Sequence, residues 1–244
     1  MRKIMFLLFG LFISTANAES INITWHNADG TTYDTTTCDA GDTLVLPTAP
    51  TKRGYTFLGW ATYIPIEYLE STGTQYIDTG IIAKSGLNTK IKLSITDNSQ
   101  GCALGTYTGG QFHPTFWYRG NWDSVVGNDQ SGGTVISDYE YITEFKSDAN
   151  GFSFYVNGEL KNYGTATHAA NGKLWMFYRS GAGGGFPMKG KIFYVQIYDN
   201  DTLVRDFRPV LDLDGVPCMY DRVTDTYFYN SGTGNFIAGP VIGE

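Results

Sequence analysis

Residues 190–209, GKIFYVQIYDNDTLVRDFRP, predict two β-strands joined by a turn at residues 199–202. Alternate residues of the first strand fall on opposite faces: Phe193, Val195 and Ile197 on one, and Tyr194, Gln196 and Tyr198 on the other. The short polar side chains of the DNDT segment hydrogen-bond their own backbone in turns. Burial of each apolar residue on the first face contributes about 1.5–3 kcal/mol. The stretch therefore predicts an antiparallel sheet with one packed face.

The composition fits a protein of short strands and many turns. The chain of 244 residues contains 30 Gly, 17 Tyr and 15 Phe, and only 17% of its residues are charged. Its length accommodates one large β domain and a small module. The net charge is −7. Because an acidic protein repels nucleic acid and anionic lipid, we expect neither as a partner.

The N-terminus has the three parts of a secretory signal peptide. A basic pair at positions 2–3 precedes an apolar run at 4–13, and the small residues at 16–18 (ANA) offer a cleavage site before Glu19. A membrane anchor is the alternative, but the run is too short for a hydrocarbon core of about 30 Å. We therefore expect residues 1–18 to be removed, which takes 2 of the 17 basic residues and leaves 15 against 24 acidic residues. The mature chain would be secreted, periplasmic or on a bacterial cell surface, without membrane insertion.

Three cysteines, Cys38, Cys102 and Cys218, follow the predicted cleavage site. Export permits disulfides, but an odd number leaves at least one thiol outside any pair within the chain. Cys102 and Cys218 fall in one predicted domain, so they either pair with each other or are buried thiols. No zinc-ligand spacing occurs, and turn formation explains most Asp residues near the C-terminus. We expect no metal and no cofactor.

Strand-like runs follow one another at short intervals, and Gly, Asn and Asp separate them. The runs cover residues 21–25, 32–38, 90–95, 102–107, 115–118, 139–145, 152–156, 174–178, 192–198, 203–210 and 226–229. Asn157-Gly158 is the strongest two-residue hairpin signal. No long amphipathic helix is found. The pattern is typical of an all-β sandwich or barrel.

The segment GYTFLGW at residues 54–60 resembles the end of an internalin-type B repeat, a small β module of bacterial surface and secreted proteins. The positions that match the family signature are Gly54, Tyr55, Phe57, Gly59 and Trp60. Tyr55 and Phe57 share a strand face, and Trp60 can close a core too small to form from aliphatic residues alone. The resemblance covers residues 21–61 and implies a β-grasp-like spacer or adhesion module.

Several pieces of the remaining chain resemble the laminin-G-like or concanavalin A-like lectin/glucanase superfamily. These pieces are residues 67–80 (EYLESTGTQYIDTG), 155–158 (YVNG), 190–192 (GKI), 220–221 (YD) and 232–234 (GTG). The resemblance implies a jelly-roll sandwich of two packed antiparallel sheets that binds carbohydrate or protein. Pro65 favours a domain boundary, because it restricts its neighbour to an extended form. We therefore expect a signal peptide at 1–18, a repeat module at 19–61 and a jelly roll at 62–244.

Some glycosidases share this fold and carry a Glu-x-Asp-x-Glu strand. The nearest counterpart is residues 138–144, DYEYITE, in which Asp138 and Glu140 share a face. Retaining catalysis needs two carboxyl groups roughly 5–5.5 Å apart, whereas Glu140 and Glu144 are about 13 Å apart along a strand. The three-acid pattern is absent, and the segment is interpreted as a solvated strand face. We expect no catalytic residue.

Two places combine aromatic rings with hydrogen-bonding groups, as sugar binding requires. The first contains Trp117 and Trp122 with Arg119, and the second contains Tyr194 and Tyr198 on the outward face of their strand. The alternatives are core packing of the tryptophans and an ordinary half-exposed sheet face. The sequence thus predicts an exported, non-catalytic recognition or adhesion module for a glycan or a surface protein. A divergent glycoside hydrolase and a purely structural display domain are the other two hypotheses.

Overall fold

The computed structural model describes residues 3–11, 20–27, 31–39, 43, 45–51, 53, 55–108, 111–113, 115–125, 131–165, 172–181 and 185–242. Every regular element in these residues is a β-strand, so the predicted all-β class is confirmed. The chain divides into two compact units. The first comprises Met1–Glu67, Val210–Val216 and Gly239–Glu244, and the second comprises Tyr68–Pro209 and Pro217–Ala238. No helix in the described residues is long and apolar enough to cross a membrane.

The first unit contains a four-stranded sheet in the order β3-β2-β1-β4. Its strands are β1 (Lys3–Leu11), β2 (Ser20–His26), β3 (Thr32–Asp39) and β4 (Tyr55–Ala61). β1 pairs antiparallel with β2 and parallel with β4. The predicted removal of residues 1–18, which include β1, stays a prediction.

Tryptophan side chains form the core of this small sheet. Trp25 is 1% exposed, and its ring centroid lies 4.6 Å from that of Trp60 in an edge-on arrangement. The Trp25 indole Nε1–H donates to Thr36 Oγ1 at 2.9 Å. Trp60 therefore closes an aromatic core, whereas the side chains of Tyr55 and Phe57 lie outside the described part of the chain.

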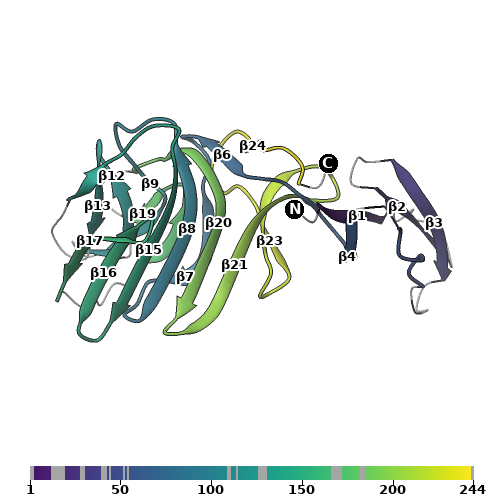
Figure 1. The fold of residues 1–244 in the computed structure, drawn as a ribbon, viewed down its shortest axis with the longest axis horizontal. Coiled ribbons are helices and arrows are strands. Elements are labelled where there is room, and N and C mark those ends of the chain that lie inside the picture. The colour runs from purple at the N-terminus through teal and green to yellow at the C-terminus, as the bar shows by residue number, and fades with distance from the viewer. Residues whose placement is uncertain are drawn as a thin grey trace. The chain divides into compact units, whose positions relative to one another are not determined.

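The largest sheet has eleven strands in the order β17-β16-β15-β8-β20-β21-β22-β23, with β5, β6 and β24 off this path. Its strands are β5 (Ile64–Pro65), β6 (Leu69–Thr72), β8 (Leu87–Ile95), β15 (Glu140–Asp148), β16 (Gly151–Val156), β17 (Glu159–Gly164), β20 (Lys189–Asp199), β21 (Thr202–Leu211), β22 (Pro217–Asp221), β23 (Thr226–Phe228) and β24 (Ile237–Ala238). Figure 1 shows its long strands side by side in front.

Two smaller sheets form the second layer, with orders β11-β10-β18-β7 and β14-β13-β12-β9. Their strands are β7 (Ile77–Ile82), β9 (Gly101–Cys102), β10 (Leu104–Thr108), β11 (Gln111–His113), β12 (Thr115–Tyr118), β13 (Asn121–Val125), β14 (Ser131–Thr134), β18 (Lys173–Met176) and β19 (Arg179–Gly181). Pairing is antiparallel except for β19, which runs parallel to β10. The predicted two-layer antiparallel sandwich is confirmed.

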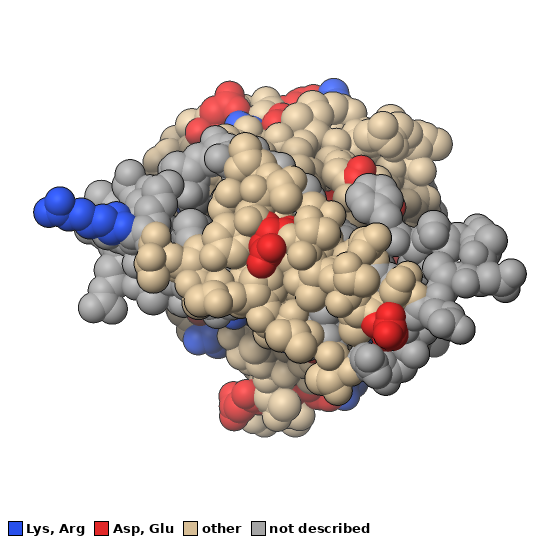
Figure 2. Space-filling view, turned by 90° about the vertical axis from the view of Figure 1, so that its right-hand side faces the viewer, with Lys and Arg blue, Asp and Glu red and all other residues tan. Residues whose placement is uncertain are grey.

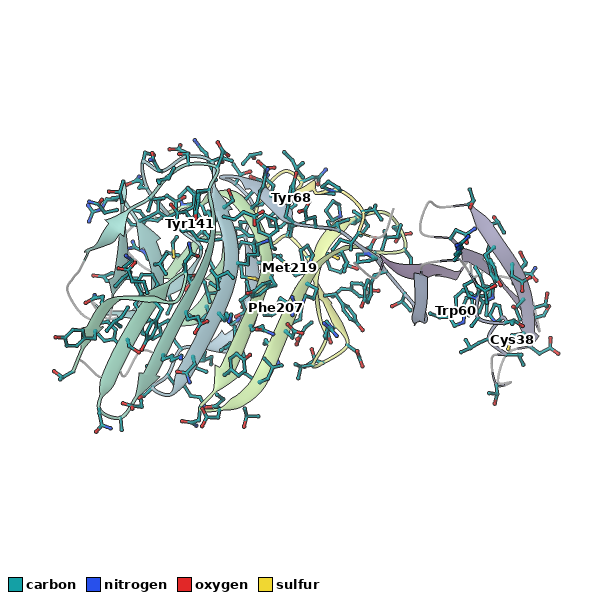
Figure 3. All side chains as sticks on the ribbon, in the orientation of Figure 1. Cys38, Trp60, Tyr68, Tyr141, Phe207 and Met219 are labelled. Atoms are coloured by element: carbon teal, nitrogen blue, oxygen red, sulfur yellow. The ribbon has the colours of Figure 1, made fainter. Side chains whose placement is uncertain are left out.

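Alternate side chains of both layers fill the sandwich. Those fully buried include Ile77, Ile91, Leu93, Leu104, Phe154, Leu174, Met176, Val195, Ile197 and Phe207. Phe207 and Met219 lie inside the second unit in Figure 3. Burial of each such side chain contributes about 1.5–3 kcal/mol. On the face that Figure 2 shows, uncharged residues cover most of the described surface.

The predicted hairpin at residues 190–209 is confirmed, but one of its side chains was misplaced. Val195 pairs with Phe207, and Asp199 pairs with Thr202. The register of β20 against β8 shifts between Ile192 and Tyr194. A bulge of this kind puts two residues opposite one and breaks the alternation. Ile192 therefore points into the core at 0% exposure, whereas Phe193 is half-buried outside it, with its ring 5.7 Å from that of Tyr68 and 4.3 Å from Lys92 Nζ.

The Asn157-Gly158 hairpin between β16 and β17 is also confirmed. Both residues have positive φ, 51° and 81°, as the tight turn requires. Asn157 Oδ1 accepts a hydrogen bond from the Ile142 N–H at 2.8 Å. The turn residue thereby anchors the hairpin to the neighbouring strand β15.

The cysteines are thiols, and none of the three forms a disulfide. Cys102 and Cys218 are both buried in the second unit. Burial in apolar surroundings raises the pKa of the Cys102 thiol far above its usual range, although Arg179 opposes this rise. Of the two alternatives, the structure shows buried thiols.

Candidate functional site

Two adjoining clefts lie at one end of the large sheet, where the β15–β16 turn, the start of β8 and the β20–β21 turn come together (Figure 1). The first cleft has a volume of about 510 Å³ and the second about 290 Å³. The first is lined by Asn88, Lys146, Ser147, Asp148, Asn150, Gly151, Phe152, Ser153, Gly164, Asn200 and Asp201. The second is lined by Asn88, Thr89, Lys90, Glu144, Phe145, Lys146, Tyr198, Asn200 and Asp201. We call the two clefts together the groove.

The floor of the groove is held by Asn88 at the start of β8. Its Oδ1 accepts from the Ser147 N–H at 2.8 Å, and its Nδ2 donates to the Asn200 carbonyl at 3.0 Å. The Asn200 N–H in turn donates to the Gly86 carbonyl at 2.7 Å. One amide side chain therefore links β15, β8 and the β20–β21 turn.

The β15–β16 turn forms one wall of the groove. Asp148 Oδ1 accepts from the backbone N–H groups of Asn150 at 2.6 Å and Gly151 at 3.1 Å. Gly151 has a φ of 151°, and a Cβ at this position would lie 2.0 Å from the Gly164 carbonyl oxygen. The chain needs glycine here because any side chain would strike the backbone of β17. These contacts fix the turn, and Asn150 in the turn and Ser153 in β16 line the first cleft.

The second cleft combines an aromatic ring with charged groups. Tyr198 is half-buried, and its hydroxyl donates to Gln196 Oε1 at 3.3 Å. Lys90 Nζ lies 2.8 Å from Glu144 Oε1, and Lys146 Nζ lies 3.7 Å from Glu144 Oε2. The hydrogen bond from Lys90 lowers the pKa of Glu144, and the same bond raises the pKa of Lys90. Both groups are therefore charged at neutral pH.

The five predicted ligand residues belong to two segments of the second unit. Trp117, Arg119 and Trp122 belong to the β12–β13 hairpin, and Tyr194 and Tyr198 belong to β20. Tyr198 lines the second cleft. Tyr194 lies four residues before Tyr198 on the same strand face, half-buried under the Arg208 guanidinium at 5.0 Å, and it is not part of the cleft lining. Arg119 is exposed in the turn between β12 and β13. The side chains of Trp117 and Trp122 lie outside the described part of the chain.

The other groove residues, which lie on strands β8, β15, β16 and β17 and in the two turns, were not predicted. Residues 199–202 (DNDT) were predicted as a turn alone, and residues 148–151 (DANG) were not singled out. Hairpin turns between antiparallel strands lie at the ends of a sheet. The strand order β16-β15-β8-β20-β21 brings these two turns to the same end. That order is not readable from local patterns.

The acidic strand segment is paired with lysines. Glu140 Oε2 lies 2.7 Å from Lys92 Nζ, and Glu144 is held by Lys90. A general acid in glycoside hydrolysis needs a raised pKa, whereas the pKa of Glu144 is lowered. This arrangement favours the solvated-face interpretation. No group of three or more His, Cys, Asp or Glu residues in the described part of the chain could hold a metal ion.

Comparison with known proteins finds a match to a repeat family over part of the chain and a similarity of fold. The family model of the Listeria-Bacteroides repeat domain matches residues 22–84. No curated protein matches the chain. The structure of a "putative carbohydrate binding protein" from Bacteroides ovatus is similar at a TM-score of 0.55 and 12% identity, over 94% of this chain and 70% of that chain. A native heptameric SAP-like pentraxin from Limulus polyphemus has a TM-score of 0.47 and 12% identity, over 73% of this chain and 94% of that chain. At 12% identity, the first similarity shows the β-sandwich fold alone.

Proposed function

We propose that this protein is an exported, non-catalytic recognition or adhesion module that binds a glycan or a protein at a bacterial cell surface. One observation carries the proposal: Tyr198 and a set of amide, hydroxyl and carboxylate side chains converge on the groove. Ligand sites are concave and place a few polar groups among ordered walls. An aromatic face beside such groups suits the alternating apolar and hydroxyl surfaces of a sugar.

The sequence supports the rest of the proposal. The signal-like segment 1–18 supports export, and the internalin-type signature at 54–60 supports a surface module over residues 19–61. The laminin-G-like pieces support a ligand-binding jelly roll over residues 62–244. The similarity to the Bacteroides ovatus protein, whose name states carbohydrate binding, agrees with a glycan ligand.

The test is a glycan array probed with the purified full chain and two tyrosine variants. Tyr198→Ala should lose the bound glycans, because it removes the aromatic wall of the second cleft. Tyr139→Ala should retain them. Tyr139 is 50% exposed and directly precedes β15, at the end of that strand away from the groove. Bound glycans should be recovered intact.

Three results would count against the proposal. Binding unchanged by Tyr198→Ala would exclude the groove as the site. Absence of binding to any glycan or bacterial surface protein would exclude the function. Hydrolysis that disappears in Glu144→Gln would show an enzyme instead.

A further inference from the structure

The two clefts are compartments of one groove. They share four lining residues: Asn88, Lys146, Asn200 and Asp201. The second cleft extends from these residues toward Tyr198, and the first extends toward Asn150 and Ser153. A ligand that fills both must be longer than one that fills either.

From this geometry we infer that the groove binds an uncharged oligosaccharide across two sugar subsites, one at Tyr198 and one at Asn150 and Ser153. The inference rests on the proposed function and specifies its ligand. Small-molecule sites span roughly 300–1,000 Å³. At about 290 and 510 Å³, each cleft suits a single small unit, and the groove suits two joined units.

The charges of the lining select against acidic sugars. Lys90 and Lys146 both face Glu144, at 2.8 and 3.7 Å. Asp148 and Asp201 form no ion pair with a basic residue in the described part of the chain. Three carboxylates against two ammonium groups repel a uronate or a sulfate, and the two lysines prevent the groove from being a purely anionic cation site. Hydroxyl groups can instead donate to the carboxylates in charge-assisted hydrogen bonds.

The compartments exist without ligand. Asn88 joins the floor to both walls through two hydrogen bonds, and Asp148 Oδ1 accepts two backbone hydrogen bonds within its own turn. A cavity held by its own contacts loses little conformational entropy when a ligand binds. Affinity should therefore follow the number of occupied subsites.

Calorimetric titration of the full chain tests the inference with neutral gluco-, manno- and galacto-oligosaccharides of one to four units. Oligogalacturonates and oligoglucosamines provide acidic and basic comparisons. For at least one neutral series, affinity should rise about tenfold or more from one unit to two, as expected when a second subsite is filled, and then level off. Tyr198→Ala and Asn150→Ala should each remove that rise, with thermal melting confirming that both variants are folded.

A second pair of variants tests the charge selection. Asp201→Asn removes a shared carboxylate and should weaken discrimination against oligogalacturonate by several-fold. Asp138→Asn removes an exposed carboxylate just before β15, at the far end of that strand from the groove, and should leave discrimination unchanged.

Equal affinity for one and two units, or tighter binding of either charged series, would overturn the inference. If a charged glycan or a protein still binds in a Tyr198-dependent manner, the proposed function survives this failure. If nothing binds, both fail.

Discussion

At the residue scale, the buried side-chain amide of Gln75 joins two loop segments that are distant in the sequence. Its Oε1 accepts from the Thr72 N–H at 2.9 Å and from Ser71 Oγ at 3.0 Å, and its Nε2 donates to the Asn235 carbonyl at 3.1 Å. Thr74 Oγ1 also donates to the Thr233 carbonyl at 2.9 Å. These bonds fasten the STGTQ segment to the GTG segment, which lie some 160 positions apart in the chain.

Gln75→Ala should lower the free energy of unfolding by about 2–4 kcal/mol, because several buried donors and acceptors would lose their partner. Thr74→Val is the matched control. It removes one exposed hydrogen bond and should cost no more than about 1 kcal/mol. Urea unfolding of the full chain measures both, and equal costs would show that the Gln75 network has no special role.

Asp97 should make the stability of the fold depend on pH in the acidic range. Hydrogen bonding to Ser99, followed by hydrogen bonding to Lys189, lowers the pKa of Asp97 to about 2. A carboxyl group with a lowered pKa stabilises the fold above its unfolded value, near 3.8, and this stabilisation is lost as pH falls toward 2. NMR titration should show the Asp97 pKa moving upward in Ser99→Ala. A titration curve that does not move would assign the low pKa to the Ser99 backbone N–H and Lys189 rather than to the Ser99 hydroxyl.

At the scale of elements, regular alternation was predictable and its interruptions were not. The pattern in β20 placed Val195 and Ile197 in the core correctly, because side chains of an extended strand alternate by geometry. It misplaced Phe193, because the bulge depends on how β20 pairs with β8. A strand's own sequence contains no information about its partner's register. The groove was missed for the same reason, since strand order brings its turns together.

Two turn glycines should differ sharply in cost when each is changed to alanine. A Cβ at Gly151 would lie 2.0 Å from a backbone oxygen, whereas a Cβ at Gly158 would meet nothing within 4 Å. Gly158→Ala should therefore cost only the left-handed backbone strain, about 1–2 kcal/mol. Gly151→Ala must displace β17 and should cost at least about 3 kcal/mol. Chemical denaturation ranks the two, and the reverse order would contradict the turn geometry.

At the scale of the whole molecule, two cores of different kinds occur in one chain. The first unit relies on Trp25 and Trp60, because a small sheet buries little aliphatic surface and needs large rings. The second unit is packed by many aliphatic and aromatic side chains from two layers. Composition and turn spacing predicted the larger core, and the signature at residues 54–60 predicted a small core closed by Trp60. The sequence patterns did not predict that residues 210–216 and 239–244 belong to the first unit. Local patterns do not show which distant segments of a chain come together in the fold.

Separate cores predict separate unfolding transitions. Trp25→Ala removes the buried ring of the first unit and should lower that unit's stability by about 3–5 kcal/mol. Phe154→Ala should do the same to the second unit, where Phe154 is 0% exposed. Hydrogen exchange followed by mass spectrometry on the full chain can assign each loss of protection to β2–β3 or to β15–β16. Trp25→Ala should leave protection of the groove strands unchanged, because Trp25 belongs to the first compact unit and the groove strands belong to the second. If both variants lowered protection in both regions equally, the chain would unfold as one cooperative unit, and the two cores would not be independent.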